Sequence, residues 1–385
     1  MTHTDKPIIT LEDIAQRVGA SRSTVCRALT GNGEISAATA ARIKAVALEM
    51  GYNPVFHEAA RRLVLRRQGK AVVNHTIAGV FPSYFQDTPL FLNIFQGVID
   101  ALATAGYVFM LAFADETDRR HVQFPTPPSF SRGEIDGLIA VSYYDFAPLI
   151  HDLRQNPGFA TRPIVTFLNP TPGCSCVLSD EYLGGYQAIQ HLLELGHRHI
   201  LHSVIPETDH LVRRLAGCRQ AMQDAGLDPA HYLHEFTIGI DWNKPYQATG
   251  PAHGITLPAS VHPMILRLIG TLRAHPDITA YFVGNDFAAV VIWQALAQAG
   301  WRIPDDLSIL GYDDCYPDEL PGPRLPLSTI RMPRREMGRM AATLIMEILA
   351  RQDDSAVPTT RQRIVETELV LRASTAPPGS TTPMS

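Results

Sequence analysis

The chain has 385 residues, of which 45% are hydrophobic and 18% charged, and its net charge is −5. This composition is typical of a globular soluble protein. No stretch approaches the ~20 uninterrupted apolar residues that a membrane-spanning helix needs, so we expect no such helix. The polar N-terminus does not resemble a signal peptide, so we expect a cytoplasmic protein whose five cysteines stay reduced.

The charge is distributed unevenly along the chain. The first 70 residues contain eleven Lys and Arg against six Asp and Glu, a net charge of +5, so the remainder carries −10. A basic head on an acidic body is the pattern expected when only the head contacts phosphate groups.

Residues 10–29, TLEDIAQRVGASRSTVCRAL, predict two short helices around a tight turn. Thr10 with Asp13 is a capping pair for the first helix, and Gly19 suits a left-handed turn. Ser21 is a cap for a second helix from Arg22 to Leu29. This spacing is typical of a helix-turn-helix, whose second helix enters the DNA major groove, although it also fits a plain helical hairpin.

The head continues with a third predicted helix, which begins after Ser36 and ends at Gly51. The next segment, His57 to Lys70, permits a helix but is too short to be stable alone. It is either a charged linker or a hinge that folds on DNA and inserts Leu63 into the minor groove.

From about Thr76 onward, short apolar runs alternate with amphipathic helical patterns. This alternation predicts an α/β fold with parallel sheets covered by helices on both faces. About 300 residues are more than a single hydrophobic core usually contains, so we expect two lobes. Ligands of such sheets bind beyond the carboxyl ends of the strands, which places a site between the lobes.

The sequence resembles the lactose-repressor (LacI/GalR) family of bacterial transcription regulators over almost its whole length. The resemblance rests on residues 10–29, on EISAATAARIKAVALEMGYNP and EAARRL, and on SDEYLGGYQAIQHLLELGHRHI, RRLAGCRQAM, GND, IPDDLSILGYDD and PLSTIRMPRREMG further on. It implies a helix-turn-helix head at 1–56, a hinge at 57–73, a two-lobed periplasmic-binding-protein-like body at 74–373, and crossovers near 176–180, near 329–334 and just before a last strand at 364–370. We expect a disordered tail at 374–385, rich in Pro, Ser and Thr.

The resemblance also implies site residues. Arg22 and Ser23 match the positions that read bases, and the predicted DNA-binding set is Ser21, Arg22, Ser23, Thr24, Arg27, Arg61 and Leu63. In the body, the family pattern points to Arg214, Asn285 and Asp313 as contacts of a small-molecule effector. Without the family pattern, Arg214 would be read as part of a surface salt bridge and Asp313 as a turn residue. The remaining effector contacts implied are the aromatic residues Phe91 and Trp242.

Some features depart from the family pattern. Cys26 stands where the family usually has Ser, which weakens one phosphate hydrogen bond. Three prolines in residues 121–131 exclude a regular helix there, and residues 244–263 form an extended loop in our prediction. Although His197, His199 and His202 surround one strand, no set of ligands has the spacing of a metal site, and we predict no metal or cofactor.

These patterns predict a ligand-responsive repressor that binds a pseudopalindromic operator as a homodimer. A solute-binding protein of transport type would share the two-lobed body but lack the basic head. An enzyme is not expected, because the sequence contains neither G-x-G-x-x-G nor G-x-S-x-G. The sequence leaves open the effector, whether it induces or co-represses, and whether a tetramer forms.

Overall fold

The structure is a computed structural model. It describes residues 9–30, 35–52, 73–82, 89–118, 121–124, 126–142, 146–204, 209–238, 262–315, 325–351 and 360–379. The chain divides into two compact units, Met1–Val73 and Asn74–Ser385. Among the described residues, no helix is long and apolar enough to cross a membrane.

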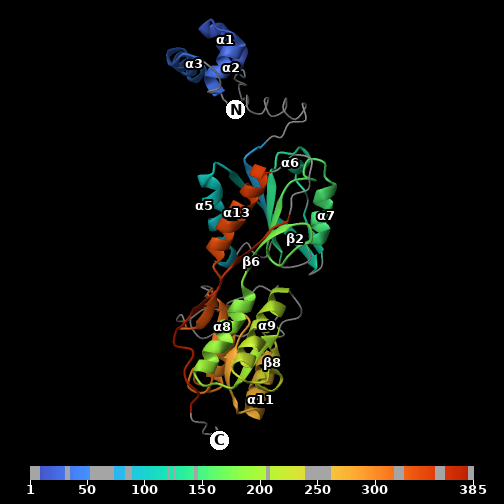
Figure 1. Cartoon of the computed structure of the whole chain (residues 1–385), viewed down its shortest axis with the longest axis vertical. Coiled ribbons are helices and arrows are strands. Elements are labelled where there is room, and N and C mark those ends of the chain that lie inside the picture. The colour runs from blue at the N-terminus through green and yellow to red at the C-terminus, as the bar shows by residue number, and fades with distance from the viewer. Residues whose placement is uncertain are drawn as a thin grey trace, which may run out of the picture. The chain divides into compact units, whose positions relative to one another are not determined.

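The N-terminal unit contains the three predicted helices, α1 (Leu11–Val18), α2 (Arg22–Thr30) and α3 (Ala37–Glu49) (Figure 1). The capping box at Thr10 is present, since its Oγ1 accepts from the Asp13 amide while its own amide donates to the Asp13 carboxylate at 2.7 Å. Gly19 follows α1 in the left-handed region at φ 66°. Ile14, Val25 and Ile43 form the fully buried centre, one from each helix.

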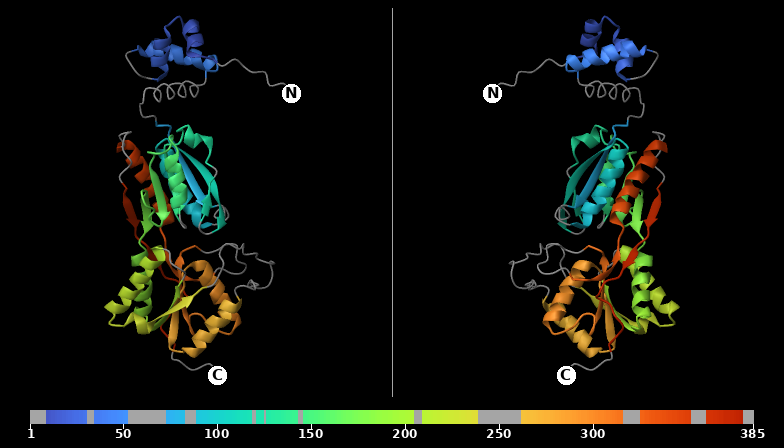
Figure 2. Two further views of the ribbon diagram at one scale, coloured as in Figure 1. Left: turned by 90° about the vertical axis from the view of Figure 1, so that its right-hand side faces the viewer. Right: turned by 90° about the vertical axis from the view of Figure 1, so that its left-hand side faces the viewer.

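The first lobe of the body is a seven-stranded sheet in the order β12-β6-β5-β4-β1-β2-β3. Its pairs are parallel except β2 with β3. Helices α5 (Pro89–Thr104) and α13 (Arg334–Arg351) cover one face, and α6 (Pro128–Ser131) and α7 (Ala147–Gln155) cover the other (Figures 1 and 2). The strands are β1 (Thr76–Pro82), β2 (Val108–Asp118), β3 (His121–Gln123), β4 (Gly137–Ser142), β5 (Ile164–Leu168), β6 (Ser175–Ser179) and β12 (Gln362–Val365).

The second lobe is a six-stranded sheet in the order β13-β11-β10-β9-β7-β8, parallel except where β13 meets β11. Its strands are β7 (His199–Val204), β8 (Leu233–Thr237), β9 (Ile278–Phe282), β10 (Ser308–Asp313), β11 (Ser328–Arg331) and β13 (Glu368–Val370). Helices α8 (Glu181–Glu194) and α9 (Asp209–Asp224) cover one face, while α11 (His262–Ala274) and α12 (Asp286–Gln298) cover the other, and α10 (Pro229–Tyr232) precedes β8. The α/β prediction is therefore confirmed.

The chain crosses between the two sheets after β6, after β11 and between β12 and β13. The first two crossings lie where the sequence predicts them. The third corrects the prediction, because the single last strand expected at 364–370 is two strands in different sheets. Asp180 ties two crossings together, since its amide donates to Val365 O at 2.8 Å and its carbonyl accepts from Thr367 Oγ1 at 3.2 Å.

Two further expectations differ from the structure. Within residues 121–131 a short helix does form, but it begins at Pro128, where a missing amide and a fixed φ are tolerated. The predicted disorder from Ser374 is wrong for residues 374–379. Ser374 is fully buried, its hydroxyl donates to Ile309 O at 2.6 Å, and His197 Nε2 contacts Ala376 O at 2.9 Å. Ser374 thereby bonds to the backbone of both β10 and β11, since its Oγ also accepts from the Ser328 amide at 2.7 Å.

Candidate functional site

The start of α2 presents an exposed polar surface in the N-terminal unit. Ser21 is occupied as a cap, since its Oγ accepts from the Thr24 amide at 3.1 Å and lies 2.8 Å from Thr24 Oγ1. Arg22, Ser23 and Arg27 are exposed. Such a helix start combines exposed hydroxyl groups with cationic side chains, which suits contact with phosphates and base edges.

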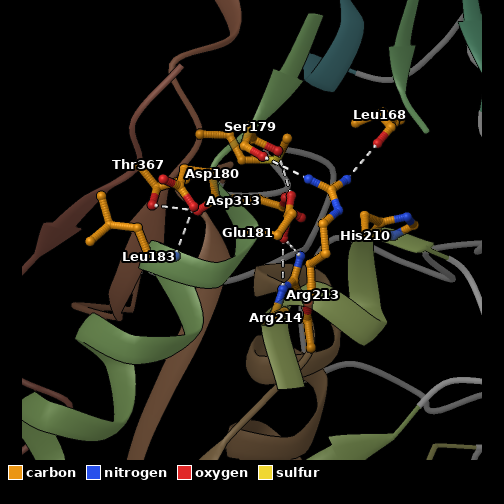
Figure 3. Close-up of polar contacts among 12 residues, drawn as sticks. Leu168, Ser179, Asp180, Glu181, Leu183, His210, Arg213, Arg214, Asp313 and Thr367 are labelled. Atoms are coloured by element: carbon orange, nitrogen blue, oxygen red, sulfur yellow. Dashed lines mark hydrogen bonds and ion pairs between the residues drawn. The ribbon is translucent and has the colours of Figure 1, made fainter. Parts of the chain in front are cut away.

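In the second lobe, the centre of the candidate site is a buried ion pair between α9 and the start of α8 (Figure 3). Arg214 Nε and Nη2 donate to Glu181 Oε2 at 3.0 and 2.8 Å. Nη1 donates to Gly284 O at 2.6 Å, and the guanidinium lies 3.3 Å from the centroid of the Tyr312 ring. Arg214 is 4% exposed and Glu181 is 1% exposed, so the surface salt bridge considered for Arg214 is in fact buried.

Helix packing sets this geometry. A Cβ at Gly185 would overlap the carbonyl group of Arg214, and a Cβ at Gly217 would overlap that of Tyr182. The two glycines therefore let α8 and α9 approach closely enough for the ion pair to form. Burial alone would raise the pKa of Glu181, but Arg214 and further neighbours outweigh it and hold this pKa below its usual value. The pair is accordingly ionised.

Asp313, at the carboxyl end of β10, forms a second ion pair beside the first. Its Oδ1 lies 3.1 Å from Arg334 Nη2, and its carbonyl accepts from Arg334 Nη1 at 2.7 Å. Burial raises the pKa of Asp313, while the charges of Arg334 and Arg214 oppose that rise. Asp313 has φ 111°, an uncommon value for a residue with a side chain, and such strain concentrates at functional sites.

The N-terminus of α12 adds two further polar residues at this end of the second lobe. Asn285 caps the helix, with Oδ1 accepting from the Ala288 amide at 2.8 Å. The next residue, Asp286, is buried and accepts from Thr329 Oγ1 at 2.6 Å and from the Cys315 amide at 2.9 Å. Burial, together with the nearby charge of Asp313, raises the pKa of Asp286 to about 8. Sequence reasoning did not single out Asp286, Glu181 or Arg334.

The start of α9 joins the two lobes. The backbone amide and Nδ1 of His210 lie 3.2 and 3.1 Å from Asn169 Oδ1, just beyond β5 of the first lobe. Arg213 Nη2 donates to Leu168 O at 3.2 Å, and Nη1 donates to Ser179 O at 3.5 Å (Figure 3). Burial lowers the pKa of His210 to about 4, so its imidazole is neutral at pH 7. We call these contacts the interlobe bridge.

The structure thus brings Arg214, Asn285 and Asp313 to one end of the second sheet, close to the interlobe bridge. The side chains of Phe91, Trp242, Arg61 and Leu63 lie outside the described residues, so their predicted roles stay predictions.

Comparisons with known proteins agree with this architecture. Residues 10–55 match the family described as bacterial regulatory proteins, lacI family. Residues 37–246 match the periplasmic binding proteins and sugar binding domain of the LacI family, and residues 189–375 match a periplasmic binding protein-like domain.

Individual proteins are similar along almost the whole chain. The HTH-type transcriptional regulator CelR of Thermobifida fusca is 29% identical over 95% of this chain and 98% of its own length. The ribose operon repressor of Escherichia coli K12 is 28% identical over 88% of this chain and 92% of its own length. A solved complex of the regulator CelR with cellobiose aligns with a TM-score of 0.56 at 25% identity, covering 96% of this chain and 100% of that one.

A helix-turn-helix unit followed by two periplasmic-binding-type lobes defines a DNA-binding transcriptional regulator with a ligand-binding body. The chain belongs to the lacI family of bacterial regulatory proteins.

Proposed function

We propose that the protein is a cytoplasmic repressor that binds a pseudopalindromic operator as a homodimer and is controlled by a small polar metabolite, of which sugars are the leading class. The metabolite binds at the carboxyl ends of the second-lobe strands, facing the first lobe. Arg22 and Ser23 read bases, with Ser21, Thr24 and Arg27 as neighbouring contacts. In the hinge, Arg61 contacts the phosphate backbone of the DNA and Leu63 enters the minor groove.

One observation carries the effector site: Arg214–Glu181 and Asp313–Arg334 are two adjacent charged pairs at the sheet end beside the interlobe bridge. An ionised Arg–carboxylate pair offers donors and acceptors side by side, which is what a ligand rich in hydroxyl groups needs. Asn285 adds a polar amide at the same end, and Phe91 and Trp242 supply apolar ring faces. The cellobiose bound to CelR and the name of the ribose operon repressor support a sugar-class ligand.

Control of DNA affinity follows from the interlobe bridge. A ligand held by the second lobe displaces or tightens the contacts of His210 with Asn169 and of Arg213 with Leu168. Either change alters the angle between the lobes, and thereby the placement of the two heads of a dimer. The ligand must bind with different affinity in the two arrangements for this to occur.

The proposal is tested by a thermal-shift screen of the full-length protein against mono- and disaccharides and nucleosides, because a specific ligand raises the unfolding temperature by mass action. Each hit is then titrated into a complex with duplex DNA selected from a random pool. We expect one sugar class both to stabilise the protein and to shift its operator affinity. Stabilisation by a sugar without any selected DNA sequence would favour the transport-type solute-binding protein instead.

A further inference from the structure

Three potential metal ligands meet at the amino ends of adjacent strands in the second lobe. His199 begins β7, His234 is the second residue of β8, and Asp277 immediately precedes β9. Their ligand atoms all lie within 4.8 Å of one another. This is the end of the sheet opposite Arg214 and Asp313, because β7, β8 and β9 run parallel to β10. The cluster is therefore separate from the proposed effector site.

The distances in the cluster centre on one nitrogen. His199 Nδ1 lies 3.0 Å from His234 Nε2 and 3.1 Å from Asp277 Oδ2. A single proton on Nδ1 satisfies only one of these partners well. Tetrahedral zinc with bonds of 2.0–2.2 Å places its ligand atoms roughly 3.3–3.5 Å apart. Both contacts of His199 Nδ1 therefore need to lengthen by only a few tenths of an ångström to admit a metal ion, and the His234 and Asp277 ligand atoms already lie within 4.8 Å of each other.

Two further histidines lie beside the cluster. The ring of His231 lies 5.7 Å from that of His199, and the ring of His275 lies 5.9 Å from that of His234, measured between centroids. His199 and His234 are half-buried and Asp277 is 49% exposed, so an ion can reach the cluster from solvent.

We propose that His199, His234 and Asp277 bind one divalent transition-metal ion of the zinc class. Two imidazoles and one carboxylate form a set that zinc, cobalt and nickel prefer over magnesium and calcium, which take oxygen ligands. Water fills the fourth position, and the rings of His231 and His275 lie beside the cluster. A bound ion ties the starts of three neighbouring strands together and so stabilises the second lobe by mass action.

The test uses untagged, full-length protein stripped with a chelator and titrated calorimetrically with Zn²⁺ as the only probe. His199→Gln and Asp277→Asn remove one ligand each, and His151→Gln in α7 of the first lobe is a matched control at an exposed histidine outside the cluster. We expect one high-affinity zinc ion per chain in the wild type and in the control. We expect at least a tenfold loss of affinity in both cluster variants.

Two further measurements keep the outcome decisive. The unfolding temperature of each metal-free variant should lie within about 2 °C of that of the metal-free wild type. If His199→Gln falls outside this range, the zinc affinity of the variant at the half-exposed Asp277 decides the test. Cobalt in the wild type should give the visible spectrum of a four-coordinate N,O site, and this spectrum should disappear in Asp277→Asn. Equal zinc affinity in the wild type and the cluster variants would overturn the proposal. It would mean that His199 and His234 are simply hydrogen-bonded to each other beside the Asp277 carboxylate.

Discussion

Removing the carboxylate of Glu181 should destabilise the body far more than breaking an exposed pair of the same kind. In Glu181→Ala, Arg214, a residue only 4% exposed in the wild-type structure, loses the partner of two hydrogen bonds. Breaking a buried pair by removing one partner costs about 3–5 kcal/mol of unfolding free energy. At about 2 °C per kcal/mol for a body of this size, the unfolding temperature should fall by about 6–10 °C.

The control is Glu235→Ala, which removes the partner of Arg219 in the same lobe. That pair has a similar N–O distance, 3.1 Å against 2.8 Å, but its side chains are 53% and 50% exposed. Its loss should cost about 0–1 kcal/mol, because solvent screens the charges. Differential scanning calorimetry of both variants compares them directly. Equal shifts would refute the reasoning, since burial and not distance is argued to set the cost.

Three further predictions concern the head, the hinge and the buried carboxyl group. Arg22→Ala should cost roughly 1–3 kcal/mol of operator binding and relax the sequence preference at one half-site position; equal weakening on all duplexes would make Arg22 a phosphate contact only. Leu63→Ala should weaken specific DNA binding and leave the unfolding temperature of the free protein nearly unchanged, whereas a large drop without DNA would make Leu63 a core residue. The folded-state pKa of Asp286, raised to about 8, lies above the unfolded value of ~3.9. The folded state therefore holds the extra proton between these values, and its stability falls as pH rises through that window. In urea titrations from pH 5 to 8, Asp286→Asn should show a smaller decline than the wild type, and an unchanged decline would contradict the assignment.

Local signals predicted the head and the alternation of the body well. Thr10 with Asp13 and Gly19 form the cap and turn that their residue types indicate, because caps and turns depend on residues a few positions apart. The crossings after β6 and β11 were also placed correctly. The third crossing was not, since the short strands β12 (Gln362–Val365) and β13 (Glu368–Val370) have no local feature that assigns them to different sheets.

The polar partners at the site were harder to predict. Arg214 pairs with Glu181, 33 positions away, and Arg334 bonds to Asp313, 21 positions away. The order of the strands and the packing of the helices bring these pairs together. In the sequence, the only sign of them is the pair of glycines, Gly185 and Gly217, at the contact between α8 and α9. The histidine cluster was missed for the same reason. Its three side chains come from β7, from β8 and from the residue before β9, so their spacing follows no local metal-binding motif.

The disorder predicted for the tail was wrong for residues 374–379. Amino-acid composition describes an isolated segment and carries no information about the surface on which that segment packs. Residues 374–385 are rich in Pro, Ser and Thr, which is typical of disorder. The same small hydroxyl side chains fit against β10 and β11, where Ser374 accepts from the Ser328 amide at 2.7 Å.

The central claim is that a ligand bound around Arg214 changes the affinity of the head for DNA. The most direct test is an equilibrium anisotropy titration of a selected operator with wild type and Arg214→Met, with and without the sugar found by thermal shift. We predict salt-sensitive binding by the wild type, and a sugar-induced change in its affinity of about 5–150-fold that Arg214→Met lacks. Binding that ignores salt, or an equal response to the sugar in the variant, would contradict the account.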